Sequence, residues 1–286
     1  TYKAQRRGGK GIMGLSTREE DFVEHLLITS SHNMLLFITT FGRVYSLKGY
    51  EIPDAGRTAK GIAIVNLLQL SAGEKIATMI PISGFEDGKY LLMATKEGII
   101  KKTELKEYSN IRKGGLIALE LREGDELINA RLANENRDVM LVTRKGMSIR
   151  FSEADVRATG RASIGVRGIT LRDDDYVIGM DICDPANSLL IITEKGFGKR
   201  TDIEEYRIQS RGGKGLLTYK ISEKTGELAG MMMVSDADDV MLITTEGVII
   251  RIHAADISII GRNTSGVRLM RTTENNLIVS CARTDR

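Results

Sequence analysis

Two glycine landmarks recur along this chain with a period close to fifty residues, and this repeat limits the possible fold more than any other feature. The first landmark ends a threonine-containing turn after an apolar run, with spacings of 56, 48, 50 and 51 residues between Gly42, Gly98, Gly146, Gly196 and Gly247. The second has spacings of 50, 54, 50, 50 and 51 residues between Gly11, Gly61, Gly115, Gly165, Gly215 and Gly266. Two independent landmarks that keep one period indicate a repeat architecture.

The second unit shows the strand pattern of the repeat most clearly. Apolar runs at 90–95 and 99–103 flank a glycine turn and predict a β-hairpin. Two further runs, at 116–121 and 127–132, follow a long connection and are separated by an acidic turn. Helix candidates such as Thr201–Tyr206 are short. Units of this length with four strands predict a propeller-like array, in which each blade buries an apolar face against its neighbour.

The sequence therefore predicts an all-β fold with six four-stranded blades, one for each glycine of the second landmark, in a single domain over residues 1–286. The first unit contains only its third and fourth strands, and we expect its first two strands upstream of Thr1. The first blade is then incomplete, which leaves open whether the disc closes. The blade units are expected at 1–34, 35–89, 90–138, 139–187, 188–239 and 240–286.

The composition of the chain and its lack of catalytic motifs limit the classes of function that we expect. Charged residues make up 28% of the chain and hydrophobic residues 42%, as in globular proteins. No apolar run reaches the length of a membrane span, and Cys183 and Cys281 show no metal or redox spacing, so we expect a cytoplasmic protein without a membrane partner. His25, His32 and His253 have no recurring acidic partner. We expect no catalytic residue, metal or cofactor here, although a site in a central channel stays an open alternative.

Positive charge is concentrated in one half of every unit. The five windows from a first-landmark glycine to the next second-landmark glycine carry a combined charge of +9, and residues 1–11 add +4, although the whole chain carries only +3. Because equivalent positions of a radial array lie on one ring, this pattern predicts a basic track. Glycine backbone beside Arg and Lys suits phosphate groups. With 5% aromatic residues and no base-reading helix, we expect duplex DNA bound with little sequence preference.

The predicted DNA-binding residues all lie on this track. The stretch from Gln5 to Gly11 is its most basic turn, because three cations stand among three glycines there. A solvated basic rim is the alternative interpretation for the individual cations. The predicted residues are Gln5, Arg6, Arg7, Gly8, Gly9, Lys10, Gly11, Arg43, Arg57, Lys60, Lys101, Lys102, Arg112, Lys113, Arg150, Arg161, Lys199, Arg200, Arg211, Lys214, Arg251 and Arg262.

The heptad Gln5–Gly11 matches, residue for residue, the signature box of the C-terminal domain family of DNA gyrase A, a type IIA topoisomerase, and the chain resembles this family over essentially its whole length. Further similar segments are Tyr2–Ala4, Gly42–Tyr45, Arg161–Val166 and Gly247–Arg251. The resemblance implies a six-bladed β-pinwheel, a propeller-like disc whose blades exchange strands with their neighbours. It also implies that the domain wraps duplex DNA, which lets the enzyme introduce negative supercoils.

The resemblance further implies partners and a location. The partners are double-stranded DNA, the N-terminal part of gyrase A, and gyrase B in an A2B2 holoenzyme, in the bacterial cytoplasm at the nucleoid. ATP and Mg²⁺ belong to other parts of that holoenzyme, and this domain alone would break no DNA. Two alternatives stay open. One is the topoisomerase IV C-terminal domain, which usually has a degenerate box and fewer blades; the other is a protein-docking propeller with an acidic partner.

Overall fold

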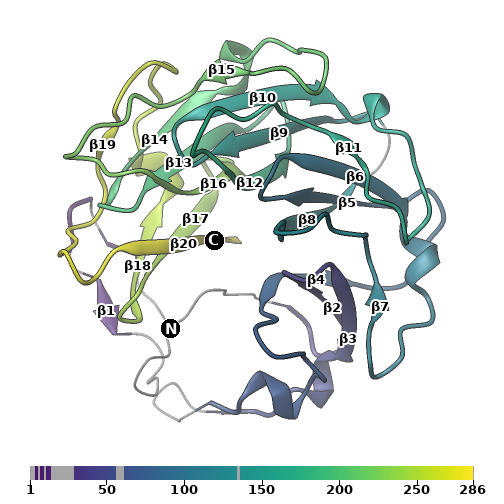
Figure 1. Cartoon of the computed structure of the whole chain (residues 1–286). Coiled ribbons are helices and arrows are strands. Elements are labelled where there is room, and N and C mark those ends of the chain that lie inside the picture. Colours follow the sequence, from purple (N-terminus) through teal and green to yellow (C-terminus); the bar gives the residue numbers. More distant parts are fainter. Residues whose placement is uncertain are drawn as a thin grey trace.

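The computed structural model describes residues 4–5, 7–9, 11–13, 29–55, 61–133 and 136–285 of the chain. These residues form five four-stranded antiparallel sheets, arranged around a centre (Figure 1). The all-β, propeller-like architecture is therefore confirmed.

The strands are short, and the helices are single turns of 3-10 helix in the connections. The predicted hairpin of the second unit is present as β5 and β6, and the helix candidate at 201–206 contains η5. The strands are β1 (Ile12–Met13), β2 (Met34–Thr39), β3 (Arg43–Lys48), β4 (Ile76–Ile82), β5 (Tyr90–Thr95), β6 (Ile99–Glu104), β7 (Leu116–Ile117), β8 (Leu127–Ala133), β9 (Asp138–Thr143), β10 (Met147–Ser152), β11 (Val166–Arg167), β12 (Val177–Ile182), β13 (Ser188–Thr193), β14 (Phe197–Asp202), β15 (Leu216–Leu217), β16 (Leu228–Val234), β17 (Asp238–Thr244), β18 (Val248–His253), β19 (Val267–Arg268) and β20 (Ile278–Asp285). The helices are η1 (Gly49–Glu51), η2 (Ile64–Asn66), η3 (Leu105–Tyr108), η4 (Glu153–Asp155), η5 (Ile203–Glu205) and η6 (Ala254–Asp256).

Each sheet takes its outer strand from the following unit. From the inner edge outward, the strand orders are β4-β2-β3-β7, β8-β5-β6-β11, β12-β9-β10-β15, β16-β13-β14-β19 and β20-β17-β18-β1. The N-terminal strand β1 therefore completes the sheet that contains the last strand, β20. These pairings are the strand exchange that the family resemblance implies.

A repeated threonine turn builds the hairpin in the middle of each sheet. The hydroxyl oxygen of Thr95 accepts a hydrogen bond from the backbone N of Ile99 at 3.1 Å, and the equivalent bonds in the other four hairpins are 3.0 to 3.2 Å long. The turn glycines have φ between +75° and +93°. Because side chains disfavour this conformation, glycine is required at this landmark.

The second landmark marks a close approach between two backbones. Gly11, Gly115, Gly165, Gly215 and Gly266 all have φ between +69° and +99°. A Cβ atom added at Gly165 would lie 2.6 Å from the carbonyl oxygen of Ile100 in β6. Gly61 differs, because its backbone does not have positive φ and a Cβ there would have no atom within 4 Å.

The predicted count of six blades is wrong, since the described residues form five sheets. The second landmark marks an outer strand rather than a blade, and an outer strand needs the edge of a neighbouring hairpin. The sequence has five threonine-turn hairpins. The segment after Gly61 forms η2 where the other units have a strand, and it pairs with no strand of the described part of the chain.

The apolar cores lie between neighbouring sheets. Leu91 of β5 is buried in the same cluster as Leu36 of β2, whereas Leu92 belongs to the cluster of Leu141 in β9. Successive side chains of a strand face opposite sides. The hairpin strands are therefore apolar on both faces, which explains their continuous hydrophobic runs. The run 231–233, predicted to fill the core, is buried in β16.

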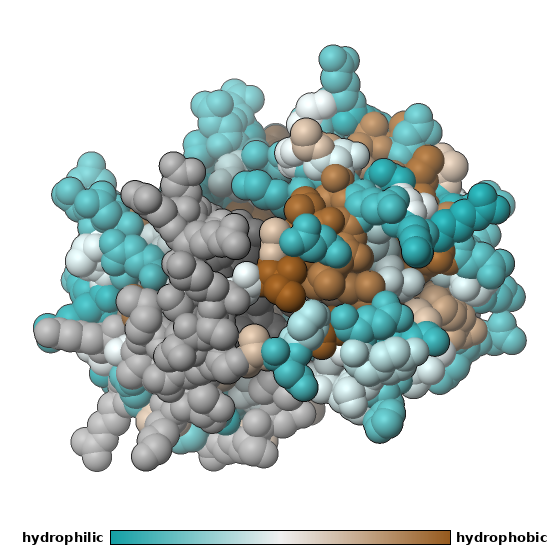
Figure 2. Space-filling view, turned by 90° about the horizontal axis from the view of Figure 1, so that it is seen from below, coloured by the Kyte–Doolittle hydropathy of each residue, from teal (hydrophilic) through white to brown (hydrophobic). Residues whose placement is uncertain are grey.

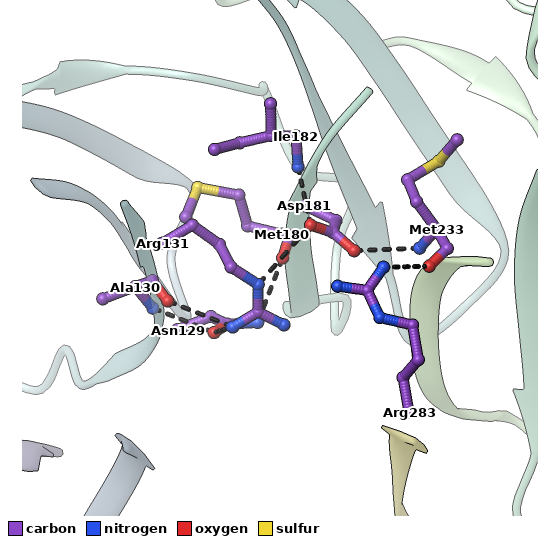
Figure 3. Close-up of polar contacts among 8 residues, drawn as sticks. All are labelled: Asn129, Ala130, Arg131, Met180, Asp181, Ile182, Met233 and Arg283. Carbon is purple, nitrogen blue, oxygen red and sulfur yellow. Dashed lines mark hydrogen bonds and ion pairs between the residues drawn. The ribbon is translucent and has the colours of Figure 1, made fainter. Parts of the chain in front are cut away.

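Polar contacts join the inner strands around the centre (Figure 3). Asp181 of β12 accepts a hydrogen bond from the backbone N of Met233 in β16 at 2.8 Å. The other carboxylate oxygen of Asp181 lies 3.4 Å from Nε of Arg131 in β8. Arg283 of β20 donates to the carbonyl oxygen of Met233 at 3.0 Å. Four successive inner strands are thus linked directly.

An apolar surface lies at the edge of the disc formed by β2, β3 and the connection that carries η2. Ile62 and Val65 of this connection are 55% and 60% exposed, and a brown apolar area is visible on this side in Figure 2. Within the described residues, no helix is both long enough and apolar enough to span a membrane.

Candidate nucleic-acid interface

The second landmark belongs to loops that are pinned at both ends to the outer edge of a sheet. The loop at 209–215 leaves strand β10 at Ile208, which forms a parallel bridge with Arg150. It returns at Leu216, which pairs with Ser148. The two anchor points on β10 are only two residues apart, so the chain between them must form a compact loop directed away from the sheet.

The same pinned loop recurs on three other sheets, at 5–11, 159–165 and 260–266, always with seven residues. The heptad Gln5–Gly11 therefore lies between two anchor points, at Ala4 and Ile12, as the other three loops do. The departing bridges are Ala4 with Arg251, Ala158 with Lys102 and Ile259 with Arg200, and the returning pairs are Ile12 with Ile249, Val166 with Ile100 and Val267 with Gly198.

Each pinned loop also contacts the segment that follows the outer strand of the preceding sheet. Gly8 donates its backbone N–H to the carbonyl oxygen of Leu269 at 2.9 Å, and the equivalent Gly212 donates to Gly168 at 2.7 Å. The loops and outer strands thus form a band on the outside of the disc, called here the outer belt (Figure 1). It comprises the four pinned loops, the residues that lead into them, such as Arg157 and Arg207, the loop at 109–115 and strands β1, β7, β11, β15 and β19. Arg43 of β3, which pairs with Ile117 of β7, is counted with it.

The described part of the belt presents cations to solvent. Arg7, Arg112, Lys113 and Lys214 are exposed. The remaining predicted belt residues that the structure describes are partly buried: Gln5, Gly8, Gly9, Gly11, Arg43, Arg161, Arg211 and Arg262. Arg6, Lys10, Arg57 and Lys60 lie outside the described residues.

Two of the partly buried arginines hold the belt together. Arg211 donates from Nη1 to the carbonyl oxygen of Arg167 at 3.1 Å, and Arg262 donates from Nη1 to that of Leu217 at 2.7 Å. Arg167 and Leu217 are equivalent residues of two outer strands. Each guanidinium carries five N–H donors in a planar fork, so these contacts leave donors over for an anion.

Five predicted DNA contacts are inside the protein instead. Lys101, Lys102, Arg150, Lys199 and Arg200 are between 0% and 8% exposed. The structure therefore removes them from the candidate surface.

Three of these buried cations join neighbouring sheets through ion pairs and carbonyl groups. The N···O distance is 2.8 Å between Lys102 and Glu153, and Arg150 contacts both Asp138, at 2.9 Å, and the carbonyl oxygen of Ile203 in η5, at 3.0 Å. Arg200 pairs with Asp236 at 2.6 Å, and the fourth equivalent, the partly buried Arg251, pairs with Asp239 at 2.7 Å. Their position, four residues after the turn glycine, directs them between sheets.

Two other buried cations, both lysines, each contact the backbone of one pinned loop and hold its conformation. Nζ of Lys199 donates to the carbonyl oxygens of Gly261 at 2.8 Å and Arg262 at 2.6 Å. Lys101 makes the equivalent bond to the carbonyl oxygen of Arg161. Burial lowers the pKa of Lys101 and of Lys199 to about 8. The backbones of the Arg161 and Arg262 loops are therefore held from within.

Sequence reasoning missed four exposed arginines of the belt: Arg157, Arg167, Arg207 and Arg268. The period itself could have found them. Arg157 and Arg207 stand eight residues before a second-landmark glycine, and Arg167 and Arg268 stand two residues after one. Acidic groups interrupt the belt, since Oε1 of Glu205 accepts a hydrogen bond from the backbone N of Arg262 at 3.2 Å.

The chemical groups of the described residues limit what the belt could bind. They contain no group of three or more His, Cys, Asp or Glu residues that could hold a metal ion. Burial raises the pKa of both cysteine thiols, Cys183 and Cys281, to about 12. The belt combines guanidinium and ammonium groups with glycine-rich backbone, which is the chemistry that phosphate oxygens accept.

Comparison with known proteins agrees with this architecture. The family model described as "DNA gyrase C-terminal domain, beta-propeller" matches residues 1–30, 33–83, 89–134, 137–184, 187–235 and 238–285. DNA gyrase A of Clostridium acetobutylicum is 56% identical over 283 residues, which are 99% of this chain and 34% of that protein. The Mycolicibacterium smegmatis relative is 43% identical over 284 residues, with the same coverage. The chain spans about a third of the length of these curated relatives.

Solved structures resemble the fold closely. A DNA gyrase A C-terminal domain has a TM-score of 0.88 at 28% identity, covering 99% of this chain and 92% of that one. A C-terminal domain of DNA topoisomerase IV has a TM-score of 0.79 at 26% identity, covering 89% and 80%. The family match, the high identity over nearly the whole chain and the shared fold together show that the chain belongs to the DNA gyrase C-terminal domain family.

Proposed function

We propose that this chain binds duplex DNA along its outer belt, without sequence preference, and curves the duplex around the disc. The observation that carries the proposal is the recurrence of one pinned loop on successive sheets. Each loop has an arginine beside glycine or small-residue backbone at the same place, exposed at Arg7 and partly buried in the other three loops. A continuous polyanion can contact successive loops, whereas a small acidic ligand would occupy only one.

The proposed contact set follows the exposure of the cations. It keeps the box and the belt positions predicted from sequence. It omits the five buried cations and also Arg251, which is partly buried and pairs with Asp239. The set is Gln5, Arg6, Arg7, Gly8, Gly9, Lys10, Gly11, Arg43, Arg57, Lys60, Arg112, Lys113, Arg161, Arg211, Lys214 and Arg262, with Arg157, Arg167, Arg207 and Arg268 added.

Phosphate contacts on such a surface can offset the free-energy cost of bending the duplex. Smooth bending of a 20–30 bp duplex by 40–90° costs about 1–6 kcal/mol. A hydrogen bond to a charged group contributes about 1.5–3 kcal/mol, so a few phosphate contacts on each of several loops offset that cost. Affinity then falls with salt, with a log–log slope of about −0.9 for each neutralised phosphate.

Within a whole gyrase, we place this function beside the catalytic parts. The chain would hold the DNA next to the cleaved segment and so direct the formation of negative supercoils in the bacterial cytoplasm. DNA cleavage would belong to the N-terminal part of gyrase A, and ATP hydrolysis with Mg²⁺ to gyrase B. The intact box at 5–11 favours gyrase over topoisomerase IV.

A length and salt titration with duplex DNA tests the proposal. The chain should bind a duplex of several helical turns much more tightly than one of a single turn, because only the longer duplex reaches successive loops. Religation of a nicked circle on the protein should trap a change in linking number. Binding without length dependence and without trapped writhe would contradict wrapping and would favour a protein-docking propeller.

A further inference from the structure

A cavity of about 290 Å³ lies at the centre of the disc, where the inner strands β8, β12, β16 and β20 approach their C-terminal ends. It is therefore at the edge of each sheet opposite to the outer belt. Three arginines line it: Arg131, Arg137 and Arg283. Pockets for drug-sized ligands have volumes of about 300–1,000 Å³, so this cavity suits a smaller anionic group.

The two carboxylates that line the cavity are already engaged with donors of the protein. Asp181 accepts a hydrogen bond from the backbone N of Met233 at 2.8 Å, and its other oxygen lies 3.4 Å from Nε of Arg131 (Figure 3). Asp184 accepts a hydrogen bond from the backbone N of Ala186 at 3.0 Å. Three arginines against two carboxylates leave one net positive charge at the cavity.

Two of these arginines and one amide group of the lining have donors that the protein does not use. The exposed side chain of Arg137 has no hydrogen bond or ion pair to the described residues, and the same holds for the amide group of Asn187. Arg283 donates from Nη1 to the carbonyl oxygen of Met233 at 3.0 Å, which leaves the other N–H groups of its guanidinium. These donors are available to a bound anion.

The three groups reach the cavity from three different elements. Arg137 immediately precedes β9, Asn187 has the equivalent position before β13, and Arg283 lies on β20. The carbonyl oxygen of Arg137 accepts a hydrogen bond from the backbone N of Glu153 at 2.9 Å, which fixes the backbone there. Donors on different elements thus surround one space. A tetrahedral phosphate presents oxygens in several directions, whereas a carboxylate presents two in one plane, so the arrangement favours phosphate.

We propose that this cavity binds one phosphate group of a small ligand, held by Arg137, Arg283 and Asn187. The site does not rest on the proposed function, because it lies at the inner edges of the sheets and the proposed DNA surface lies at their outer edges. A bound phosphate connects the turns before β9 and β13 with β20, and so joins the third, fourth and fifth sheets at the centre. A ligand that binds only the folded chain also raises its stability.

The test measures phosphate binding to the complete chain by isothermal titration calorimetry at constant ionic strength. The loss variants are Arg137→Gln and Arg283→Gln, which each remove a guanidinium charge and keep a polar side chain. Arg122→Gln is the matched control, because Arg122 is also exposed but lies in the turn before β8, at the other end of that strand from the cavity. Sodium phosphate, pyrophosphate and AMP are the probes, which distinguish a free ion from the phosphate group of a nucleotide.

We expect one saturable site per chain. Arg137→Gln and Arg283→Gln should each weaken phosphate binding about tenfold or more, because a charge-assisted hydrogen bond is lost, and Arg122→Gln should leave the affinity unchanged. The melting temperature of the wild type should rise with phosphate concentration more than that of either loss variant. Without phosphate, Arg137→Gln should melt as the wild type does, since its side chain makes no bond within the described part of the chain.

Absence of saturable binding, or the same affinity in all four proteins, would overturn the site. Tighter binding of AMP than of inorganic phosphate would support it with a nucleotide as the ligand, and equal binding would support it with the free ion. A long duplex bound beforehand should leave the phosphate affinity unchanged. Displacement of phosphate by DNA would overturn the inference, because the ion would then occupy the belt. Failure of the chain to bind the duplex at all would contradict the proposed function and leave the phosphate site standing.

Discussion

At the scale of single residues, position decides what a cation does in this fold. Arg150 and Arg157 are seven residues apart, yet Arg150 is 8% exposed between two sheets whereas Arg157 is exposed on the belt. Strand residues four positions after the turn glycine point between sheets, and loop residues point to solvent. The same side-chain chemistry therefore stabilises the protein at one position and is available to an anion at the other.

The pair Arg150 and Arg157 separates these two roles. Arg150→Ala leaves the partly buried Asp138 without its partner, and breaking a buried ion pair costs at most about 3–5 kcal/mol. Arg157→Ala should change the free energy of unfolding by less than about 0.5 kcal/mol, but it should make the salt slope of DNA binding shallower by about 0.9. Urea denaturation and salt titration measure the two effects. Equal stabilities of the variants would contradict the assigned burial.

The second-landmark glycines offer a matched test of backbone strain. Gly165 has φ of +99°, and a Cβ there would lie 2.6 Å from the carbonyl oxygen of Ile100. Gly165→Ala should therefore destabilise the protein by about 2 kcal/mol or more. Gly61→Ala should be nearly neutral, because a Cβ there meets no atom within 4 Å. Urea midpoints of both variants check this, and a large loss at Gly61 would contradict it.

The buried lysine Lys199 should make stability depend on pH. Burial lowers its pKa to about 8, whereas the ordinary value is 10.5, so the unfolded chain holds more protons between these values. The free energy of unfolding then rises with pH in this window, by up to about 1.4 kcal/mol per pH unit from this group.

Comparison with Lys199→Met isolates that contribution, because the variant keeps the aliphatic stem but lacks the proton. The difference in unfolding free energy between wild type and variant should move in favour of the wild type from pH 7.5 to pH 9.5. Urea titrations at the two pH values measure it. A difference that does not change with pH would show that Lys199 keeps its ordinary pKa.

At the scale of elements, the pinned loop is the unit from which the candidate interface is built. Its seven residues leave and rejoin one strand edge at points two residues apart, as at Ala4 with Arg251 and Ile12 with Ile249. The heptad at 5–11 is thus a structural loop as well as a family signature. It differs from the other loops by its additional cations.

That difference predicts unequal roles for the loops. Replacement of Arg6, Arg7 and Lys10 by Ala should weaken wrapping more than Arg262→Ala does, because three cations are lost and Arg262 is partly engaged with Leu217. Writhe trapped on nicked circles is the measurement, with the single variant Arg7→Ala as a like-for-like comparison for Arg262→Ala. Equal effects of the triple variant and Arg262→Ala would show that the box has no special contribution.

At the scale of the whole molecule, the exchange of outer strands ties the sheets into one structure. Each sheet is completed by the next unit, and the last is completed by β1 from the N-terminal end. The inner strands are joined in addition, as through Asp181 and Met233 (Figure 3). A sheet in this arrangement depends on its neighbours for both its outer strand and its apolar cover.

Removal of residues 1–13 should therefore expose the edge of β18 at the opposite end of the chain. Backbone amides of β18 that lie at this edge should exchange hydrogen faster in the shortened chain, since β1 no longer covers Val248 and Ile249. Amides of β10, which is covered by β15, serve as the internal control and should exchange as before. Unchanged exchange in β18 would mean that β1 does not protect that edge in solution.

The sequence alone determined the repeat, the hairpins and the basic half of each unit, because these features are local. In each turn, a threonine hydroxyl accepts a hydrogen bond from the backbone N–H four residues later, and a glycine between them adopts positive φ. These two features form the same turn wherever they occur. The tertiary structure alone decided three other features. They are the sheet that each outer strand joins, the five sheets in place of six, and the burial of five cations that the charge pattern had assigned to DNA. Each of these features depends on a contact with residues about fifty or more positions away in the chain. The local sequence around Gly61, Lys199 or Arg150 does not show whether such a contact forms.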